Sequence, residues 1–196
     1  MKPAPAIGPN AVTQLVPALT RQGFEAMVPQ LFAGAGVAGW LADPPSAMVD
    51  ERMVAALHRT LRAGLPPEQA SQVLAEAGRL TADYLLAARI PALAQAVLKL
   101  LPASLAASLL VGAIKAHAWT FAGSGRFSAL GGKPLILKIT NNPLCAGEHA
   151  AAPICSWHAA VFQRLFEVLV SRHVRVDEID CEARGDDACR FSIDWS

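Results

Sequence analysis

The last quarter of the chain carries a spacing of metal-ligand residues that limits how it can fold. Cys155 is followed by Glu178, Cys181 and Cys189, in the pattern Cys-x22-Glu-x2-Cys-x7-Cys. Three thiolates and one oxygen ligand suit tetrahedral zinc, and a set of four protein ligands leaves no open position for catalysis. The spacing therefore predicts a structural zinc site that ties the C-terminal strands together.

The spacing also predicts the local backbone. Cys181 and Cys189 lie symmetrically about Gly185, so a hairpin that turns at 184–186 places their side chains opposite each other. Glu178 lies three residues before Cys181, and strict strand alternation would put it on the other face. The predicted site therefore needs a bulge between Glu178 and Asp180. Without a bulge, other acidic residues compete as the oxygen ligand: Asp177, Asp180 and Glu182.

Other interpretations of the same residues remain open. The N-terminal stretch Met1–Ala6 shows no secretory signal, which argues against a disulfide between Cys181 and Cys189. The cysteines can also pack without a metal, as small hydrophobic residues do. Cys145, the fourth cysteine, is either an extra thiol near the site or a loop residue. His158 either packs in the core, orients Cys155, or replaces Glu178 as the fourth ligand.

Composition limits the class of protein. At 196 residues the chain predicts one compact domain, in which 53% of residues are hydrophobic and 17% are charged. Its longest uncharged stretches, 26–42 and 100–114, are shorter than the roughly 20 residues of a membrane-spanning helix. We therefore expect the apolar surplus to line a ligand cavity and a homodimer interface. The net charge of +1 and the lack of a basic cluster argue against a nucleic-acid partner.

Hydrophobic periodicity changes from helical to strand-like near the middle of the chain. This order predicts an α+β fold, with a helical N-terminal region at 1–101 and a ligand-binding region with the zinc site at 102–196. The helical half packs on a small antiparallel sheet that ends in the zinc-clasped hairpin. The expected helices are 11–21, 24–41, 47–62, 65–89, 92–101, 103–121 and 156–171, and the expected strands are 126–130, 135–140, 174–183 and 189–195.

Two histidines are separated by helix face. His117 lies in line with Leu110, Ile114 and Phe121, so we expect it to be buried, either as a core residue or as a pocket residue that bonds a ligand. His58 shares its face with Glu51 and Arg62, so we expect it to be exposed.

The C-terminal motifs resemble a known family. They are Ile139-Thr140-Asn141-Asn142-Pro143-Leu144-Cys145, then Cys155, then Glu178-x-x-Cys181, then Gly185-Asp186-Asp187-Ala188-Cys189-Arg190-Phe191. The pattern resembles the 4-vinyl reductase domain family, strongly over about 107–195 and more loosely before that. The resemblance implies an α+β fold with an apolar ligand cavity. It also implies zinc ligation by Cys155, Glu178, Cys181 and Cys189, and makes His117 and Trp119 counterparts of the His and Trp in related phenol sensors.

The family's name implies reduction of the vinyl group of a divinyl protochlorophyllide. The sequence has no cofactor fingerprint and zinc has no redox chemistry, so we expect a non-catalytic carrier, with a vinyl reductase as the alternative. The resemblance implies a magnesium tetrapyrrole or porphyrin as cargo, handed to a magnesium chelatase or methyltransferase. We expect the protein in the cytoplasm or on the surface of the photosynthetic membrane. The expected ligand-binding residues are His117, Trp119, Phe121, Phe127 and Trp40.

Overall fold

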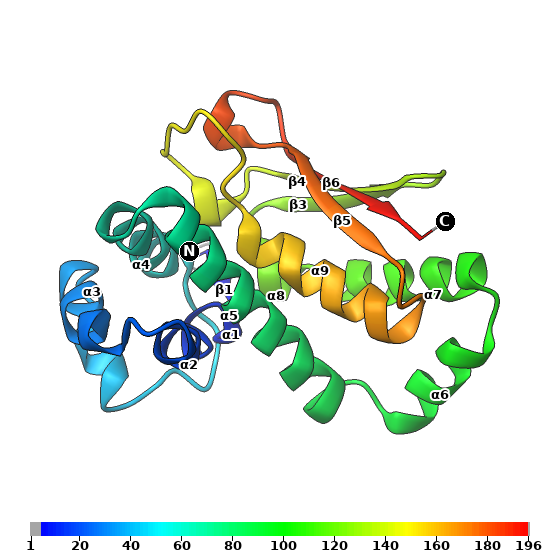
Figure 1. Ribbon diagram of the computed structural model, residues 1–196, viewed down its shortest axis with the longest axis horizontal. Helices are drawn as coiled ribbons and strands as arrows, with labels where there is room; N and C mark the ends of the chain where they lie inside the picture. The colour runs from blue at the N-terminus through cyan, green and yellow to red at the C-terminus, as the bar shows by residue number, and fades with distance from the viewer. Residues whose placement is uncertain (1–4, 196) are drawn as a thin grey trace.

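The computed structural model describes residues 5–195 and has an α+β architecture, as predicted (Figure 1). Residues 1–4, part of the stretch that shows no secretory signal, and residue 196 lie outside the described residues. Among the described residues, no helix is both long and apolar enough to cross a membrane. In the ribbon, the larger sheet forms the top layer and the helices lie beneath it.

The elements follow one another with short connections. The helices are α1 (Asn10–Thr13), α2 (Leu15–Arg21), α3 (Val28–Gly34), α4 (Glu51–Gly64), α5 (Pro67–Ala88), α6 (Ala92–Leu100), α7 (Ala103–Ala116), α8 (Trp119–Ala122) and α9 (Ser156–Leu169). Short 3₁₀ turns are η1 (Glu25–Met27), η2 (Ala38–Leu41), η3 (Pro143–Cys145) and η4 (Glu182–Arg184). The strands are β1 (Ala6–Ile7), β2 (Val49–Asp50), β3 (Arg126–Leu130), β4 (Leu135–Thr140), β5 (Arg175–Asp180) and β6 (Cys189–Asp194).

The larger sheet is antiparallel, with the strand order β3-β4-β6-β5. Alternate residues of β4 and β6 are buried, because one face of each strand packs against helices. Helix α9 covers that face, and α5 packs along α9 on the side away from the sheet (Figure 1). The two helices approach closely at Gly78, where a β-carbon would lie 2.3 Å from the carbonyl oxygen of Trp157.

The interior between α9 and the sheet is built from aromatic rings. Phe162 packs edge-on against Phe191, with 5.2 Å between ring centroids, and against Phe121, with 5.8 Å. Phe121 in turn packs edge-on against Phe127 at 5.4 Å. Edge-to-face pairs at these distances stabilise a core beyond the area they bury. Side chains therefore fill this part of the molecule.

Three predicted helices differ from the observed ones. Residues 24–41 form η1, α3 and η2, because the chain turns at Gly36, whose φ is +73°. Helix α4 begins at Glu51, since the Asp50 side chain caps it by accepting a hydrogen bond from the Arg52 amide and residues 49–50 pair with β1. Residues 103–121 divide at His117 into α7 and α8. The predicted domain division at residue 101 stays a prediction.

Candidate metal centre

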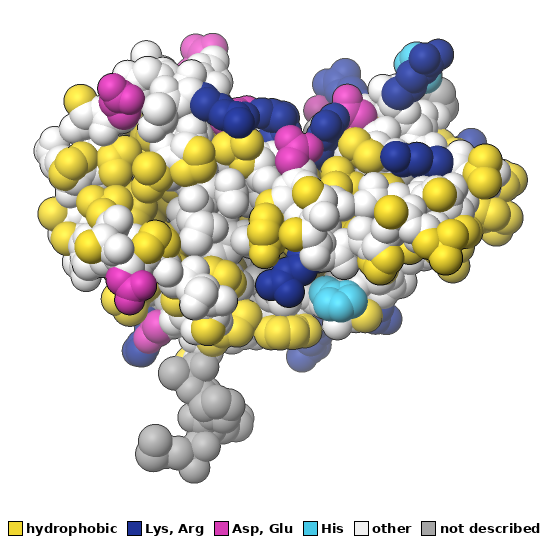
Figure 2. Space-filling view, turned by 90° about the horizontal axis from the view of Figure 1, so that it is seen from below, with side chains coloured by type: hydrophobic (Ala, Val, Ile, Leu, Met, Phe, Trp, Pro, Cys, Tyr) yellow, Lys and Arg dark blue, Asp and Glu magenta, His cyan; other side chains and the backbone are white. Residues whose placement is uncertain are grey.

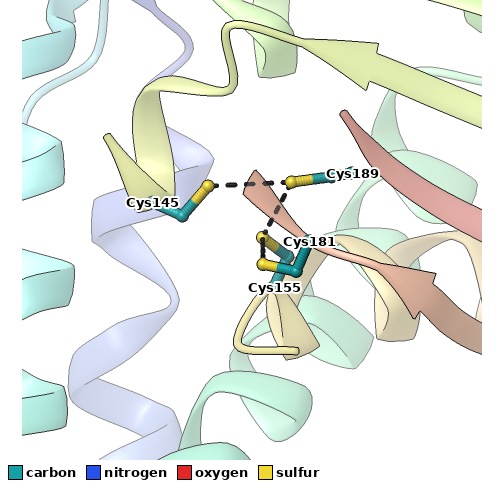
Figure 3. A group of neighbouring side chains, drawn as sticks. All are labelled: Cys145, Cys155, Cys181 and Cys189. Carbon is teal, nitrogen blue, oxygen red and sulfur yellow. Dashed lines mark hydrogen bonds between the residues drawn. The ribbon is translucent and has the colours of Figure 1, made fainter. Parts of the chain in front are cut away.

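Four separate segments bring four cysteines together. Cys145 ends η3, Cys155 caps α9, Cys181 follows β5, and Cys189 begins β6. Their side chains point toward one another (Figure 3), and the four sulfur atoms all lie within 4.8 Å of each other. The cluster therefore joins the sheet, the N-terminus of α9 and the loop after β4 at one point.

The sulfur separations suit a four-coordinate metal. Cys155 Sγ lies 3.5 Å from Cys189 Sγ and 3.8 Å from Cys181 Sγ, and Cys145 Sγ lies 3.6 Å from Cys189 Sγ. A tetrahedron with metal–sulfur bonds of about 2.3 Å has edges of about 3.8 Å. A disulfide needs sulfurs about 2.0 Å apart, and all four cysteines are free. The donor set therefore fits a tetrahedral metal and excludes the Cys181–Cys189 disulfide.

Burial makes the cluster demanding without a cation. All four cysteines are buried. Hydrogen bonding with Cys145 and the other two sulfurs raises the pKa of the Cys155 thiol well above its usual range and lowers the pKa of Cys181. Four thiols this close cannot all ionise unless a positive charge lies between them.

The amide side chain of Asn142 supports the sulfurs. This fully buried residue donates from Nδ2 to Cys155 Sγ, at 3.3 Å, and to Cys189 Sγ, at 3.4 Å. Its Oδ1 accepts a hydrogen bond from the Leu144 amide at 3.1 Å. Hydrogen bonds to ligating atoms orient them and stabilise thiolate charge. Asn142 therefore contributes to the cluster without being a ligand.

Two acidic residues hold the loop that carries Cys145. The Glu182 carboxylate accepts hydrogen bonds from the backbone amides of Asn141, at 2.6 Å, and Asn142, at 2.7 Å. Glu148 forms a largely buried ion pair with Arg62 of α4, whose Nη2 also donates to the Leu144 carbonyl at 2.6 Å. The loop is thus fastened to the hairpin on one side and to the N-terminal helices on the other.

The predicted bulge is confirmed. The register of β5 against β6 shifts between Glu178 and Asp180. One carboxylate oxygen of Glu178 accepts a hydrogen bond from the Cys155 amide at 2.7 Å, and the other, Oε1, is buried with no partner among residues 5–195. Burial, and then the neighbouring Cys181, raise the pKa of Glu178 to about 9. Cys145 completes the cluster of four, and ligation by Glu178 stays a prediction.

The other candidate ligands have different partners. Asp177 pairs with Arg175, Asp180 pairs with Arg184 and Arg190, and Glu182 binds the loop amides. His158 is buried, and its Nε2 lies 3.2 Å from the Phe121 carbonyl oxygen. Of the three roles predicted for His158, its position matches core packing.

The prediction that His58 is exposed is wrong. His58 is buried, and its Nε2 lies 2.8 Å from the Ala11 carbonyl oxygen. On the same face, Glu51 accepts hydrogen bonds from Ser124, and Arg62 binds the Cys145 loop. The face is polar because it packs against other polar segments, not because it faces water. Burial lowers the pKa of His58 to about 3.

The prediction that His117 is buried is also wrong. His117 caps the C-terminus of α7 and is exposed, as is Trp119, which begins α8. The helix ends there, so His117 does not continue the buried stripe of Leu110 and Ile114. Its Nδ1 lies 2.9 Å from the Ala113 carbonyl oxygen.

The five predicted ligand-binding residues do not form one group. Phe121 and Phe127 pack together in the aromatic core, whereas His117 and Trp119 face outward nearby in the chain. Trp40 lies in η2, which packs on α3. Figure 1 places α3 and α7 at opposite ends of the molecule. The structure therefore separates Trp40 from the other four.

The hollows that the structure shows are surface grooves with polar walls. One lies between α2, α5 and α9 and includes Glu76, Arg79 and Arg164. The other lies beside the start of α9 and includes Ser156 and Glu178. Neither is the enclosed apolar cavity expected for a tetrapyrrole, and that cavity stays a prediction.

The sequence left the role of Cys145 open and gave none to Asn142 or Arg62. The signal available for Asn142 and Cys145 was the segment Asn-Asn-Pro-Leu-Cys. In it, Asn142 caps η3 and places Cys145 one turn later. Arg62 carried no such signal, because its partners lie about 80 residues away in sequence.

Comparisons with known proteins agree with these features. Residues 135–194, which contain all four cysteines, match the model of the 4-vinyl reductase domain family. The chain is 49% identical over 187 residues to the bacteriochlorophyll synthase 23 kDa chain of Cereibacter sphaeroides, covering 95% of this chain and 89% of that protein. It is 43% identical over 189 residues to the protein of the same name from Rhodobacter capsulatus, covering 96% and 87%.

The fold also has a structural neighbour. The crystal structure of an H-NOX protein from S. oneidensis superposes with a TM-score of 0.56, covering 97% of this chain and 99% of that one, at 12% identity. Identity this low shows a shared fold alone. The identity to the two 23 kDa proteins extends over almost the whole chain and includes the region of the cysteine cluster. The chain therefore belongs to the family of bacteriochlorophyll synthase 23 kDa chains and carries a 4-vinyl reductase domain.

Proposed function

We propose that the protein binds a hydrophobic tetrapyrrole intermediate of bacteriochlorophyll biosynthesis and delivers it to a biosynthetic enzyme. The names of the two relatives support the pathway. The sequence provides no nicotinamide or flavin fingerprint for a vinyl reduction, which favours a carrier over a reductase. A magnesium chelatase or methyltransferase is the proposed recipient, and a homodimer in the cytoplasm is the proposed form.

The geometry of His117 is the observation that carries this proposal. A carbonyl oxygen only accepts hydrogen bonds, so the contact with Ala113 places the ring proton on Nδ1. The neutral imidazole then presents the lone pair of Nε2 outward from an exposed position. A histidine fixed in this way is suited to ligate the magnesium of a tetrapyrrole from one face. Trp119, which is 57% exposed, supplies aromatic surface next to it in the chain.

We propose further that the cysteine cluster binds one zinc ion, with Cys145, Cys155, Cys181 and Cys189 as ligands. The sulfur separations, the burial and the Asn142 amide support a thiolate-bound metal. A closed four-sulfur zinc site stabilises a fold and has neither an open position nor redox chemistry. The metal would therefore hold the loops together, and the cargo would bind elsewhere.

A turnover experiment separates the carrier from the reductase. Purified full-length protein is mixed with divinyl and with monovinyl magnesium tetrapyrrole, with and without a reductant, and the absorption spectrum and vinyl content are followed. A carrier shifts the spectrum of about one pigment per chain and leaves the vinyl group intact. Reduction of more pigment than protein would contradict the proposal and support the vinyl reductase.

A further inference from the structure

Helices α6 and α7 form an apolar hairpin at one end of the molecule. They join at Pro102 and lie at the end opposite α3 (Figure 1). All residues of α6 except Gln95 and Lys99 are apolar, yet the helix has no fully buried residue. A surface helix of a soluble domain normally turns its apolar stripe inward. Helix α6 therefore carries more apolar surface than the rest of the molecule covers.

The exposed apolar side chains follow a helical stripe. Leu93, Val97 and Leu100 lie at positions i, i+4 and i+7, and their exposed fractions are 77%, 47% and 86%. Helix α7 extends the surface with Leu105 and Leu109, which are 55% and 57% exposed.

Helix α7 also reverses the usual choice of buried residues. It buries Ala106 and Ala107 and exposes the larger Leu105 and Leu109. The view from below shows hydrophobic side chains gathered at the right-hand end, where the first view places α6 (Figure 2). A contiguous exposed apolar surface of this kind marks a contact site.

The charges around the hairpin indicate what it contacts. Residues 84–147 contain six Lys and Arg residues and no Asp or Glu. The remainder of the chain contains eleven Lys and Arg residues against sixteen Asp and Glu residues. Lys99 of α6 and Lys115 of α7 are both exposed. Long cationic side chains beside exposed leucines fit a surface that is apolar below and anionic above.

A second copy of the chain is a poorer match for this face. In a two-fold dimer the same patch meets itself, so Lys99 and Lys115 would meet their own copies. The segment 84–147 offers no acidic residue to pair with them. An anionic lipid bilayer provides both the acyl region for the leucines and negative headgroups for the lysines.

We propose that the α6–α7 hairpin docks the protein on the surface of an anionic lipid bilayer. Leu93, Leu100 and Leu109 insert into the boundary between headgroups and acyl chains, and Lys99 and Lys115 contact the headgroups. The helices lie in the plane of the interface, since both are too short to cross the bilayer. This docking does not depend on the identity of the cargo.

Vesicle co-sedimentation of the full-length protein tests the docking. We expect binding to vesicles of phosphatidylcholine with about one-third phosphatidylglycerol, weaker binding to phosphatidylcholine alone, and release when salt rises roughly from 0.1 to 0.5 M. The double variant Leu93→Ser with Leu100→Ser should lower the partition coefficient at least about tenfold. Both side chains are highly exposed, so the fold should be retained, as circular dichroism can verify. Leu41→Ser, on η2, is the matched control and should bind as the wild type does.

Charge and oligomeric state complete the test. Lys99→Glu with Lys115→Glu should reduce binding to the anionic vesicles to the level seen with phosphatidylcholine. Equal binding by the wild type and the leucine double variant, or no binding by the wild type, would overturn the proposal. A solution dimer that the leucine double variant dissociates would also overturn it, because the hairpin would then be an interface between copies.

Discussion

Replacing Asn142 with alanine tests whether the side-chain amide supports a thiolate–metal cluster. The change removes two hydrogen bonds to sulfur, from Nδ2 to Cys155 and Cys189, and the acceptor of the Leu144 amide. Each of these groups is buried, so water cannot replace the lost partner at low cost.

The contacts set the size of the effect. A buried amide without an acceptor costs about 1–3 kcal/mol, and losing the two bonds to sulfur adds about 1–2 kcal/mol. We therefore expect Asn142→Ala to lower the free energy of unfolding by about 3 kcal/mol, a large part of the roughly 5–15 kcal/mol typical of a domain. Metal affinity should fall by about 10–100-fold, as it does when other groups bonded to ligating atoms are removed.

A second variant separates the two contributions. Asn142→Asp keeps an oxygen that accepts from the Leu144 amide, but places an anion beside the thiolates. It should therefore weaken metal binding at least as much as Asn142→Ala. Urea unfolding of zinc-loaded protein measures stability, and competition with a chelator measures affinity. If Asn142→Ala lowers stability by less than about 0.5 kcal/mol and leaves affinity unchanged, the assigned role of the amide is wrong.

Three further predictions follow from other contacts. Cys145→Ser should lower the metal content below one ion per chain, whereas Glu178→Gln should leave it unchanged, as elemental analysis of purified protein would show; the reverse would favour Glu178 as the ligand. The pKa of His58 falls from 6.5 to about 3 on folding. The unfolded chain therefore binds more protons between these values, and the free energy of unfolding falls by up to about 1.4 kcal/mol per unit as pH decreases through this window. His58→Gln should show a shallower decrease in urea titrations, and an equal slope would refute the assignment. Gly78→Ala should destabilise by about 1–3 kcal/mol through its clash with α9, while Gly112→Ala, which meets nothing within 4 Å, should stabilise slightly in thermal unfolding; equal effects would contradict the packing.

The sheet and its hairpin could be predicted from local patterns. β3 and β4 have their predicted bounds, because alternation and flanking glycines mark them within a few residues. The bulge in β5 followed from the period of a strand and the three-residue spacing of Glu178 and Cys181. Gly185 adopts a φ of +98°, as expected for the residue that turns the hairpin.

The orientation of polar helix faces could not be predicted in the same way. Periodicity groups His58 with Glu51 and Arg62, but it does not show that other polar segments cover that face. The outward position of His117 depends on where α7 ends, and no proline or glycine marks that point in the sequence. Helix boundaries depend on tertiary packing as well as on local propensity.

The fourth cysteine shows a similar limit. Spacing suggested three cysteines because Cys181 and Cys189 share a hairpin and Cys155 precedes a helix. Cys145 reaches the cluster only because Glu182 and Arg62 fix the intervening loop from two sides. Those contacts join residues about 40 and about 80 positions apart, beyond the range of any local pattern.

The most direct test of the proposed carrier is pigment binding by wild-type protein and by His117→Ala, followed by spectral titration with a magnesium tetrapyrrole. His173→Ala, another exposed histidine, is the matched control. The account predicts saturation near one pigment per chain, an affinity about tenfold or more lower in His117→Ala, and no change in His173→Ala. Equal binding by all three proteins, or no binding by the wild type, would contradict it.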